Sequence, residues 1–184
     1  MLGMRLNPRG RSLPMAANIA LSPSGESLYY VSFEGASICV SAEGCEDFDA
    51  RTTNAVHHFV RNSAAAGDLR YDGSFVAPGM TYVVKVVVSS DGAAVFVLAR
   101  DTGTIVWFDR DKSTGSLGYG GMLAPDSLSG ALDATPSFDG RALFVASYSS
   151  EGLLTRVVRT GPSRGALEFD SAVTVPSSIS GSDE

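Results

Sequence analysis

The chain's two histidines and two cysteines are its first candidates for metal binding or nucleophilic chemistry. His57 and His58 are adjacent, and adjacent side chains on a strand point to opposite faces, so the pair cannot hold one ion. We expect one histidine to be half-buried against a neighbouring sheet and the other to be solvated. Cys39 and Cys45 enclose five residues, whereas paired zinc ligands usually enclose about two to four. This spacing predicts no metal site. A disulfide between Cys39 and Cys45 is an alternative that the sequence leaves undecided, and it would need an oxidising compartment.

Residues 161–165 have the sequence Gly-Pro-Ser-Arg-Gly, which matches the Gly-x-Ser-x-Gly nucleophile elbow of hydrolases. An elbow needs a strand before it and a helix after it, to raise the serine hydroxyl above a sheet. Similar turns end at residues 67 and 115, and all three turns close on the same Gly-x-Leu sequence. The segment is therefore predicted to be a turn between two strands.

Two further segments carry residue types that bind ions or phosphates. The acidic run at 43–49 could bind calcium, but it lacks the alternating Asp-x-Asp-x-Asp-Gly pattern, which favours a solvated loop. The glycine-rich segment 115–121 is not followed by Lys-Ser or Lys-Thr. It precedes a predicted strand and so offers no helix N-terminus to a phosphate. We therefore expect no bound cofactor.

The elements that must position these residues are repeated along the chain. The sequence ALSPSGESLYYVS begins at Ala20, VVSSDGAAVFVLA at Val87 and TPSFDGRALFVAS at Thr135. Each consists of an apolar strand, a tight turn with glycine and a second apolar strand, rich in the residues that β-sheets prefer. The turn glycines are Gly25, Gly92 and Gly140.

A second pair of strands follows each of these hairpins. Its turn closes on Gly67, Gly115 and Gly165, which are 48 and 50 residues apart, and its last strand ends near a proline. Four short antiparallel strands in such a unit are typical of a β-propeller blade. No segment has apolar residues at helical spacing over a helical length, which excludes a helical solenoid.

The chain is thus predicted to be all-β, a single partial propeller over residues 1–184 with about three blades and one extra N-terminal strand. Residues 1–8 would be the outer strand of a preceding blade, and the blades would cover 16–78, 79–125 and 126–176, followed by a tail at 177–184. The first blade has an insertion at 35–54. The predicted strands are 18–22, 27–33, 55–61, 69–76, 83–89, 94–100, 104–110, 117–123, 132–137, 142–148, 153–159 and 167–175.

Loops that join strand two to strand three, and strand four to the next blade, gather at one mouth of a propeller. The residues on these loops are Glu34, Arg100, Asp101, Tyr148, Glu151, Arg11, Tyr82 and Asp126. Arg100 with Glu34 or Glu151 is the one plausible catalytic convergence, because arginine can hold a carboxylate or phosphate and glutamate can transfer a proton. Solvated loop charges or a surface ion pair are the favoured alternative.

The overall charge limits the partners. A formal net charge of −6, without a basic stripe, argues against nucleic acid and weakly against an anionic membrane surface. No stretch reaches the roughly 20 apolar residues of a transmembrane helix. The N-terminus lacks the continuous apolar segment of a secretory signal, so cytoplasmic is the default expectation.

The repeat resembles the seven-bladed propellers of the lactonase family, which includes the propeller-type 6-phosphogluconolactonases and carboxymuconate-lactonising enzymes. The resemblance covers residues 16–176 and rests on scaffold sequences: SPSG at 22–25, Asp-Gly at 91–92 and 139–140, WFDR at 107–110 and TGSL at 114–117. These sequences indicate the fold and carry no catalytic residue of the family. The resemblance implies seven blades, whereas this chain has three.

Three blades leave two apolar faces open, because each blade packs against two neighbours. The chain would then be a fragment, a diverged partial member of the family, or one protomer of a ring shared between chains. The leading functional hypothesis is a non-catalytic binding or scaffold module with a small molecule or a protein at its loop face. The alternative is a lactonase-like hydrolase that is complete in a longer chain or oligomer. An extracellular module with a Cys39–Cys45 bridge is the third hypothesis.

Overall fold

The computed structural model describes residues 16–32, 54–61, 68–148, 152–160 and 166–175, and this part of the chain is almost entirely β-structure. Twelve strands form three four-stranded antiparallel sheets, which we call blades 1, 2 and 3 in chain order. Blade 1 contains β1 (Ala16–Leu21), β2 (Ser27–Ser32), β3 (Ala55–Arg61) and β4 (Leu69–Phe75). Blade 2 contains β5 (Val83–Val88), β6 (Ala94–Ala99), β7 (Thr104–Arg110) and β8 (Leu117–Leu123). Blade 3 contains β9 (Ala131–Pro136), β10 (Ala142–Ser147), β11 (Leu153–Arg159) and β12 (Leu167–Thr174).

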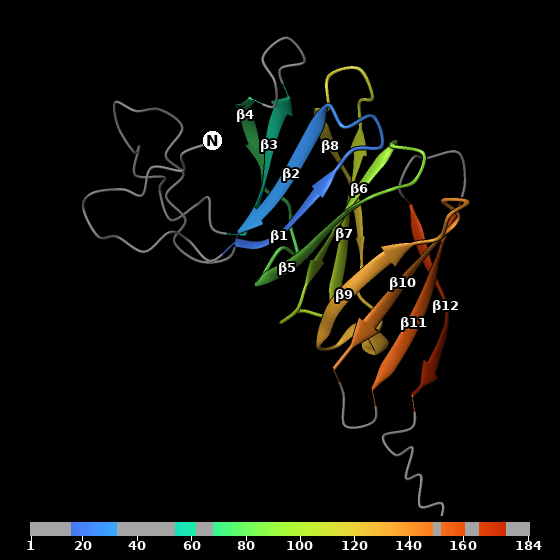
Figure 1. The fold of residues 1–184 in the computed structure, drawn as a ribbon. Helices are drawn as coiled ribbons and strands as arrows, with labels where there is room; N and C mark the ends of the chain where they lie inside the picture. Colours follow the sequence, from blue (N-terminus) through green and yellow to red (C-terminus); the bar gives the residue numbers. More distant parts are fainter. Residues whose placement is uncertain (1–15, 33–53, 62–67, 149–151, 161–165, 176–184) are drawn as a thin grey trace, which may run out of the picture.

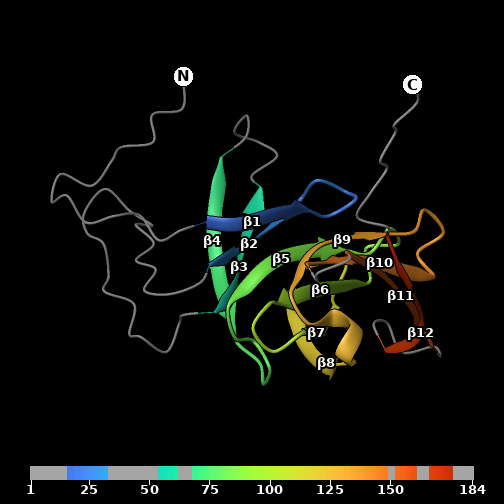
Figure 2. The same cartoon turned by 90° about the horizontal axis from the view of Figure 1, so that it is seen from below.

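Within each blade the strands pair in chain order, so every strand is hydrogen-bonded to its neighbours in sequence. The three blades stand in a row with their sheets face to face, and the first strands β1, β5 and β9 contact one another along the inner edge (Figure 1, Figure 2). The turns β1–β2, β5–β6, β9–β10 and β7–β8 lie at the upper end in Figure 1. The connections β4–β5, β6–β7 and β8–β9 lie at the lower end.

The turn between the first two strands has the same construction in each blade. Gly25, Gly92 and Gly140 adopt φ angles of +71°, +69° and +69°, a region that glycine enters at little cost. In blades 2 and 3, a serine before the turn (Ser89 or Ser137) accepts a hydrogen bond on Oγ from the first residue of the next strand, at 2.9 Å in both cases. The local sequence Ser-x-Asp-Gly therefore closes a tight hairpin by itself.

Two apolar cores lie between the blades. Every residue of β6 is buried, because blade 2 packs on both of its faces. The core between blades 1 and 2 includes Tyr29, Val31, Val56, Val83, Val86, Val88, Val95, Val97, Val106, Phe108 and Leu117. The core between blades 2 and 3 includes Val87, Phe96, Leu98, Ile105, Leu128, Ala134, Leu143, Val145, Val157 and Leu167. The stability of each blade therefore depends on its neighbour.

The strand pattern confirms the predicted all-β fold, and four of the twelve predicted strands have the observed bounds. The unpredicted element is the short 3₁₀ helix η2 (Asp126–Leu128), whose Leu128 is fully buried in the core between blades 2 and 3. The predicted strand 1–8, the tail 177–184 and nearly all of the insertion 35–54 lie outside the described residues.

Candidate functional site

The lower end of the blades in Figure 1 carries the loops on which sequence reasoning placed the candidate site. One hydrogen bond recurs there: the backbone N–H of Arg100 donates to the carbonyl oxygen of Tyr82 (3.0 Å), and that of Tyr148 to Gly130 (2.9 Å). Arg100 and Tyr148 thus occupy equivalent positions in blades 2 and 3. Arg100 is exposed, and 74% of the Tyr148 surface is accessible to solvent.

Tyr82 has an unusual backbone conformation at this end. Its φ angle is +51°, whereas the equivalent position in blade 3 is Gly130, with φ +71°. A left-handed conformation is costly for a bulky residue, by about 1–3 kcal/mol. Asn54 is also left-handed (φ +62°), and its Oδ1 accepts a hydrogen bond from the backbone N–H of Val83 (3.3 Å). Val83, the first residue of blade 2, therefore follows one left-handed residue in sequence and is hydrogen-bonded to the side chain of another.

The described residues include part of the predicted convergence of charges. Arg100 and Asp101 lie on the β6–β7 turn, and Asp126 begins η2, all at the lower end. Glu34 and Glu151, the predicted partners of Arg100, lie outside the described residues, as does Arg11. The pairing of Arg100 with either glutamate therefore stays a prediction.

An ion pair joins the inner strands of blades 2 and 3. The Nζ atom of Lys85 lies 2.8 Å from Oδ1 of Asp133. The hydrogen bond from Lys85 lowers the pKa of the Asp133 carboxyl. The inner strands of blades 1 and 2 are tied by a weaker contact, from the backbone N–H of Val86 to Oδ1 of Asn18 (3.4 Å). Sequence reasoning missed both contacts, because each joins residues of different blades.

The prediction that one histidine is solvated is wrong. The two rings do point to opposite faces of β3, but His57 and His58 are 1% and 0% exposed. His57 lies near the rings of Tyr30 and Tyr71, and its Nε2 is 3.1 Å from Oγ of Ser32. Burial lowers the pKa of His57 from 6.5 to about 4. His57 is therefore neutral at physiological pH.

His58 faces blade 2 and stacks on Tyr29, with ring centroids 5.1 Å apart. Its Nδ1 lies 3.3 Å from the Asp72 carboxylate. Burial lowers the pKa of His58, although Asp72 opposes this shift. Nε2 of His58 faces the turn at Gly115, where an added Cβ would lie 2.5 Å from it. The ring thus fills the space that the glycine leaves.

Arg110 is the central polar residue between blades 1 and 2, with 3% of its surface exposed. Its Nε donates to the phenol oxygen of Tyr29 (2.6 Å), Nη2 to Oγ of Ser27 (2.9 Å), and Nη1 to the carbonyl oxygen of Gly92 (3.1 Å). Sequence reasoning treated Arg110 as a scaffold residue. The available signal for its contacts was the repeat itself, because Arg61 and Arg159 end the third strands of the other blades.

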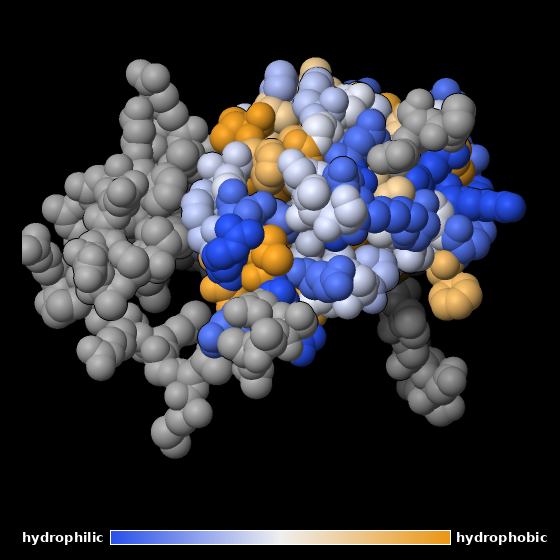
Figure 3. Space-filling model, turned by 90° about the horizontal axis from the view of Figure 1, so that it is seen from above, coloured by the Kyte–Doolittle hydropathy of each residue, from blue (hydrophilic) through white to orange (hydrophobic). Residues whose placement is uncertain are grey.

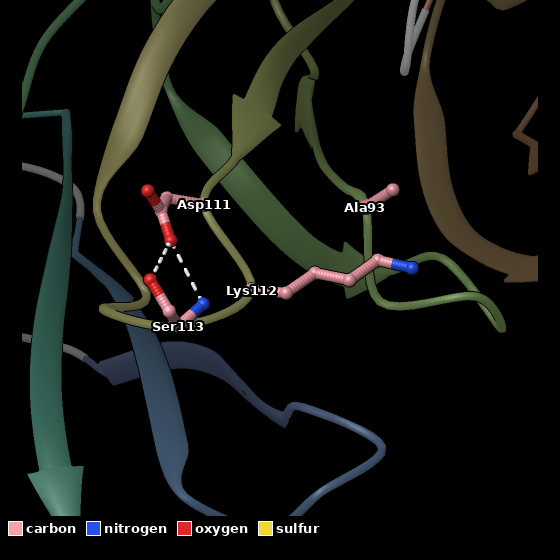
Figure 4. Close-up of a pocket in the computed structure, with 4 residues that line it drawn as sticks. All are labelled: Ala93, Asp111, Lys112 and Ser113. Atoms are coloured by element: carbon pink, nitrogen blue, oxygen red, sulfur yellow. Dashed lines mark hydrogen bonds between the residues drawn. The ribbon is translucent and has the colours of Figure 1, made fainter.

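The upper end of the blades is mostly polar, with apolar groups gathered in patches (Figure 3). A shallow, open hollow of about 440 Å³ lies there, lined by Ala93, Asp111, Lys112 and Ser113. Asp111 turns toward Ser113 and Lys112 extends toward Ala93 (Figure 4). Hydrogen bonds from the Ser113 hydroxyl and from the backbone N–H groups of Ser113 and Thr114 lower the pKa of Asp111 to about 2. This carboxylate therefore stabilises its own turn.

Several predicted features fall outside the described residues, among them Cys39, Cys45, the acidic run at 43–49 and the turn at 161–165. Within the described ranges, no three His, Cys, Asp or Glu side chains come together as a metal centre requires. No helix in the described part of the chain is long and apolar enough to cross a bilayer.

Comparison of the whole fold with solved structures defines the class of protein. The chain superimposes on a 6-phosphogluconolactonase-like protein of Bacteroides uniformis with a TM-score of 0.68 and 14% identity, covering 88% of this chain and 42% of that one. The periplasmic gluconolactonase of Pseudomonas aeruginosa gives 0.65 and 21%, covering 88% and 40%. The β-propeller domain of Myceliophteria thermophila Cps50 gives 0.56 and 14%, covering 89% and 44%.

These similarities confirm that the three sheets are blades of a partial β-propeller like those of the lactonase family. The chain spans less than half the length of each of these proteins. No family model and no curated protein sequence matches it. At these identities the comparison establishes the fold, and the function must be argued from the residues.

Proposed function

We propose that this chain is a non-catalytic binding module that presents the loop end bearing Arg100 and Tyr148 to a partner. The observation that carries the proposal is the place of the chain's two histidines. Histidine is the side chain whose ordinary pKa suits proton transfer at neutral pH. Both rings are buried, on opposite faces of β3, where His57 contacts Ser32 and His58 contacts Tyr29 and Asp72.

The loop end has the composition of a binding surface. Tyrosine and arginine are enriched among residues that carry binding energy at interfaces. Tyr148 and Arg100 are presented from equivalent positions on adjacent blades, each held by a backbone hydrogen bond to the preceding connection. Strands that hold these residues in place reduce the conformational entropy that binding costs.

A hydrolysis assay separates this proposal from a lactonase. The probes are 6-phosphogluconolactone and glucono-δ-lactone, tested with the chain and with Arg100→Ala. The proposal expects both proteins to leave the spontaneous rate unchanged. If the chain accelerates either hydrolysis and Arg100→Ala abolishes the acceleration, the proposal fails and Arg100 belongs to a lactonase site.

Photo-crosslinking tests the binding face itself. A photoreactive benzoyl-phenylalanine replaces Tyr148 at the lower end or, as a control, the fully exposed Phe138 at the upper end. We expect a defined adduct from position 148 in extracts of the source cells, absent from position 138 and lost with Arg100→Ala. Equal adducts from both positions would contradict a specific loop face.

A further inference from the structure

An arginine repeats in all three blades, and in blades 2 and 3 it joins the blade to the one before it. Arg61, Arg110 and Arg159 end the third strands, and their backbone N–H groups donate equivalent hydrogen bonds to Glu26, Ala93 and Arg141. The guanidinium of Arg159 donates to the carbonyl oxygen of Gly140 (2.9 Å), as that of Arg110 does to Gly92.

From this position the guanidinium reaches the preceding blade. Arg110 of blade 2 binds Tyr29 and Ser27 of blade 1, and Arg159 of blade 3 lies 3.2 Å from Oδ2 of Asp91 in blade 2. Arg61 holds this position in blade 1, where its side chain is exposed. Among the described residues, none accepts a hydrogen bond from its guanidinium.

The matching acceptor lies at the other end of the row. Asp139 is the blade 3 equivalent of Asp91, and both occupy the Ser-x-Asp-Gly turn. Oδ1 of Asp139 accepts hydrogen bonds from the Ser137 hydroxyl (2.6 Å) and the backbone N–H of Arg141 (3.0 Å). Asp91 uses its Oδ2 to bind the next blade. In the described part of the chain, Oδ2 of Asp139 has no such contact.

The apolar surfaces repeat the same relationship. The open face of blade 1 carries Ile19, Leu21, Leu28, Tyr30, Phe59 and Leu69. Ile19, Leu21 and Leu69 are 61%, 59% and 48% exposed. The equivalent residues of blade 2 are all buried against blade 1: Val86, Val88, Val95, Val97, Phe108 and Leu117. The open face of blade 1 is therefore built to pack on a preceding blade.

The open face of blade 3 corresponds to the face of blade 2 that packs on the following blade. It carries Phe144, Ala146, Leu154 and Val173, the last two 44% and 63% exposed. Their equivalents in blade 2 pack against blade 3: Phe96, Leu98, Ile105 and Leu123. Blades 1 and 3 lie at the two ends of the row, so no other blade in the described part of the chain packs on either face (Figure 2).

We infer that a second copy of this chain docks head to tail, with the open face of its blade 1 on the open face of blade 3, and with its Arg61 against Asp139. A second copy is the occupant because it carries both the complementary apolar face and the matching charge. The contact is heterologous, and two copies can satisfy both open faces by closing a ring. This inference does not rest on the proposed function.

Analytical ultracentrifugation of the 184-residue chain tests the inference. We expect a concentration-dependent species of twice the 19.2 kDa chain mass. Leu21→Glu places a charge on the apolar face, at the end of β1, and should weaken association about a hundredfold. Because Leu21 is exposed in the isolated chain, the variant should keep the far-ultraviolet circular dichroism spectrum of the wild type.

Charge reversal tests the register of the two copies. Arg61→Glu and Asp139→Arg should each weaken self-association by about threefold to tenfold, because each places like charges together. An equimolar mixture of the two variants should restore wild-type association, since the mixed dimer has opposite charges at both contacts. Lys112→Glu, which reverses an exposed charge on blade 2, should associate like the wild type.

Two results would overturn the inference. One is a monomer at every concentration up to about 0.1 mM, which corresponds to a binding free energy too small for a specific assembly. The two end faces would then pack against blades of a different chain or of a longer form of this one. The other is association that Leu21→Glu leaves unchanged, which would place the interface elsewhere.

Discussion

Nε of Arg110 lies 2.6 Å from the phenol oxygen of Tyr29, a residue 81 positions earlier in the chain and in the neighbouring blade. The same phenol donates a hydrogen bond to the carbonyl oxygen of Gly115 at 2.6 Å. Tyr29 therefore connects the end of β7 to the turn that follows it. Burial raises the pKa of Tyr29, against the opposing effect of Arg110, so the phenol stays protonated and can donate.

Arg110→Met should destabilise the chain by about 2–4 kcal/mol, because methionine fills the apolar stem but leaves Ser27 and Gly92 without their buried donor. The matched control is Arg159→Met. Arg159 is 15% and its partner Asp91 47% exposed, so its loss should cost about 1 kcal/mol or less. Urea unfolding followed by tryptophan fluorescence measures both. Equal losses would mean that burial of Arg110 does not strengthen its contacts.

Gly115→Ala should destabilise the chain by about 3 kcal/mol or more, because the new Cβ would meet His58 and Ser27 and the φ angle of +81° is strained for alanine. Gly118→Ala is the control in the adjoining strand. Its Cβ would meet nothing nearer than the carbonyl oxygen of Asp109 at 4.0 Å. Thermal unfolding should place Gly118→Ala close to the wild type, and a tolerated Gly115→Ala would refute the packing of His58 on this turn.

Stability should fall as the pH drops from about 6.5 to about 4. The unfolded chain protonates His57 near its ordinary pKa of 6.5, whereas the native chain does so near 4, so the unfolded state binds more protons in this range. The part of this loss that is due to His57 is at most about 3 kcal/mol. The lowered pKa of His58 acts in the same direction.

Urea unfolding at pH 7.5, 6.0 and 5.0 measures this dependence. His57→Gln removes one titrating group and should reduce the slope, with the remainder due to His58. A wild-type stability that is unchanged over this range would mean that His57 is hydrated in solution.

Lys85→Met should raise the pKa of Asp133, because the hydrogen bond from Lys85 is the main cause of its lowered value. Carboxyl ¹³C shifts followed by NMR from pH 6 to pH 2 report this pKa. Asp111 serves as the internal control: its pKa of about 2 arises from its own turn and should not move. An unshifted Asp133 would show that the Lys85–Asp133 pair does not persist in solution.

The strands could be predicted because each blade is a local structure. Apolar runs of strand length between turns that contain glycine determine each hairpin within a short stretch of sequence, and the predicted bounds of β3, β7, β8 and β11 agree with the structure. Alternation along β3 also placed His57 and His58 on opposite faces. It could not determine how deeply either ring is buried, because this depends on what covers each face.

The sequence by itself determined three four-stranded blades, their order and the turns that close them, because the interactions responsible lie within each repeat. Only the tertiary structure decided what the polar residues do. The same terminal arginine binds a phenol and a hydroxyl in blade 2, a carboxylate in blade 3, and stays exposed in blade 1. The physical reason is that the partner of this arginine lies in the preceding blade, about 70–80 residues away in sequence. The packing of the blades therefore determines which residue the arginine binds.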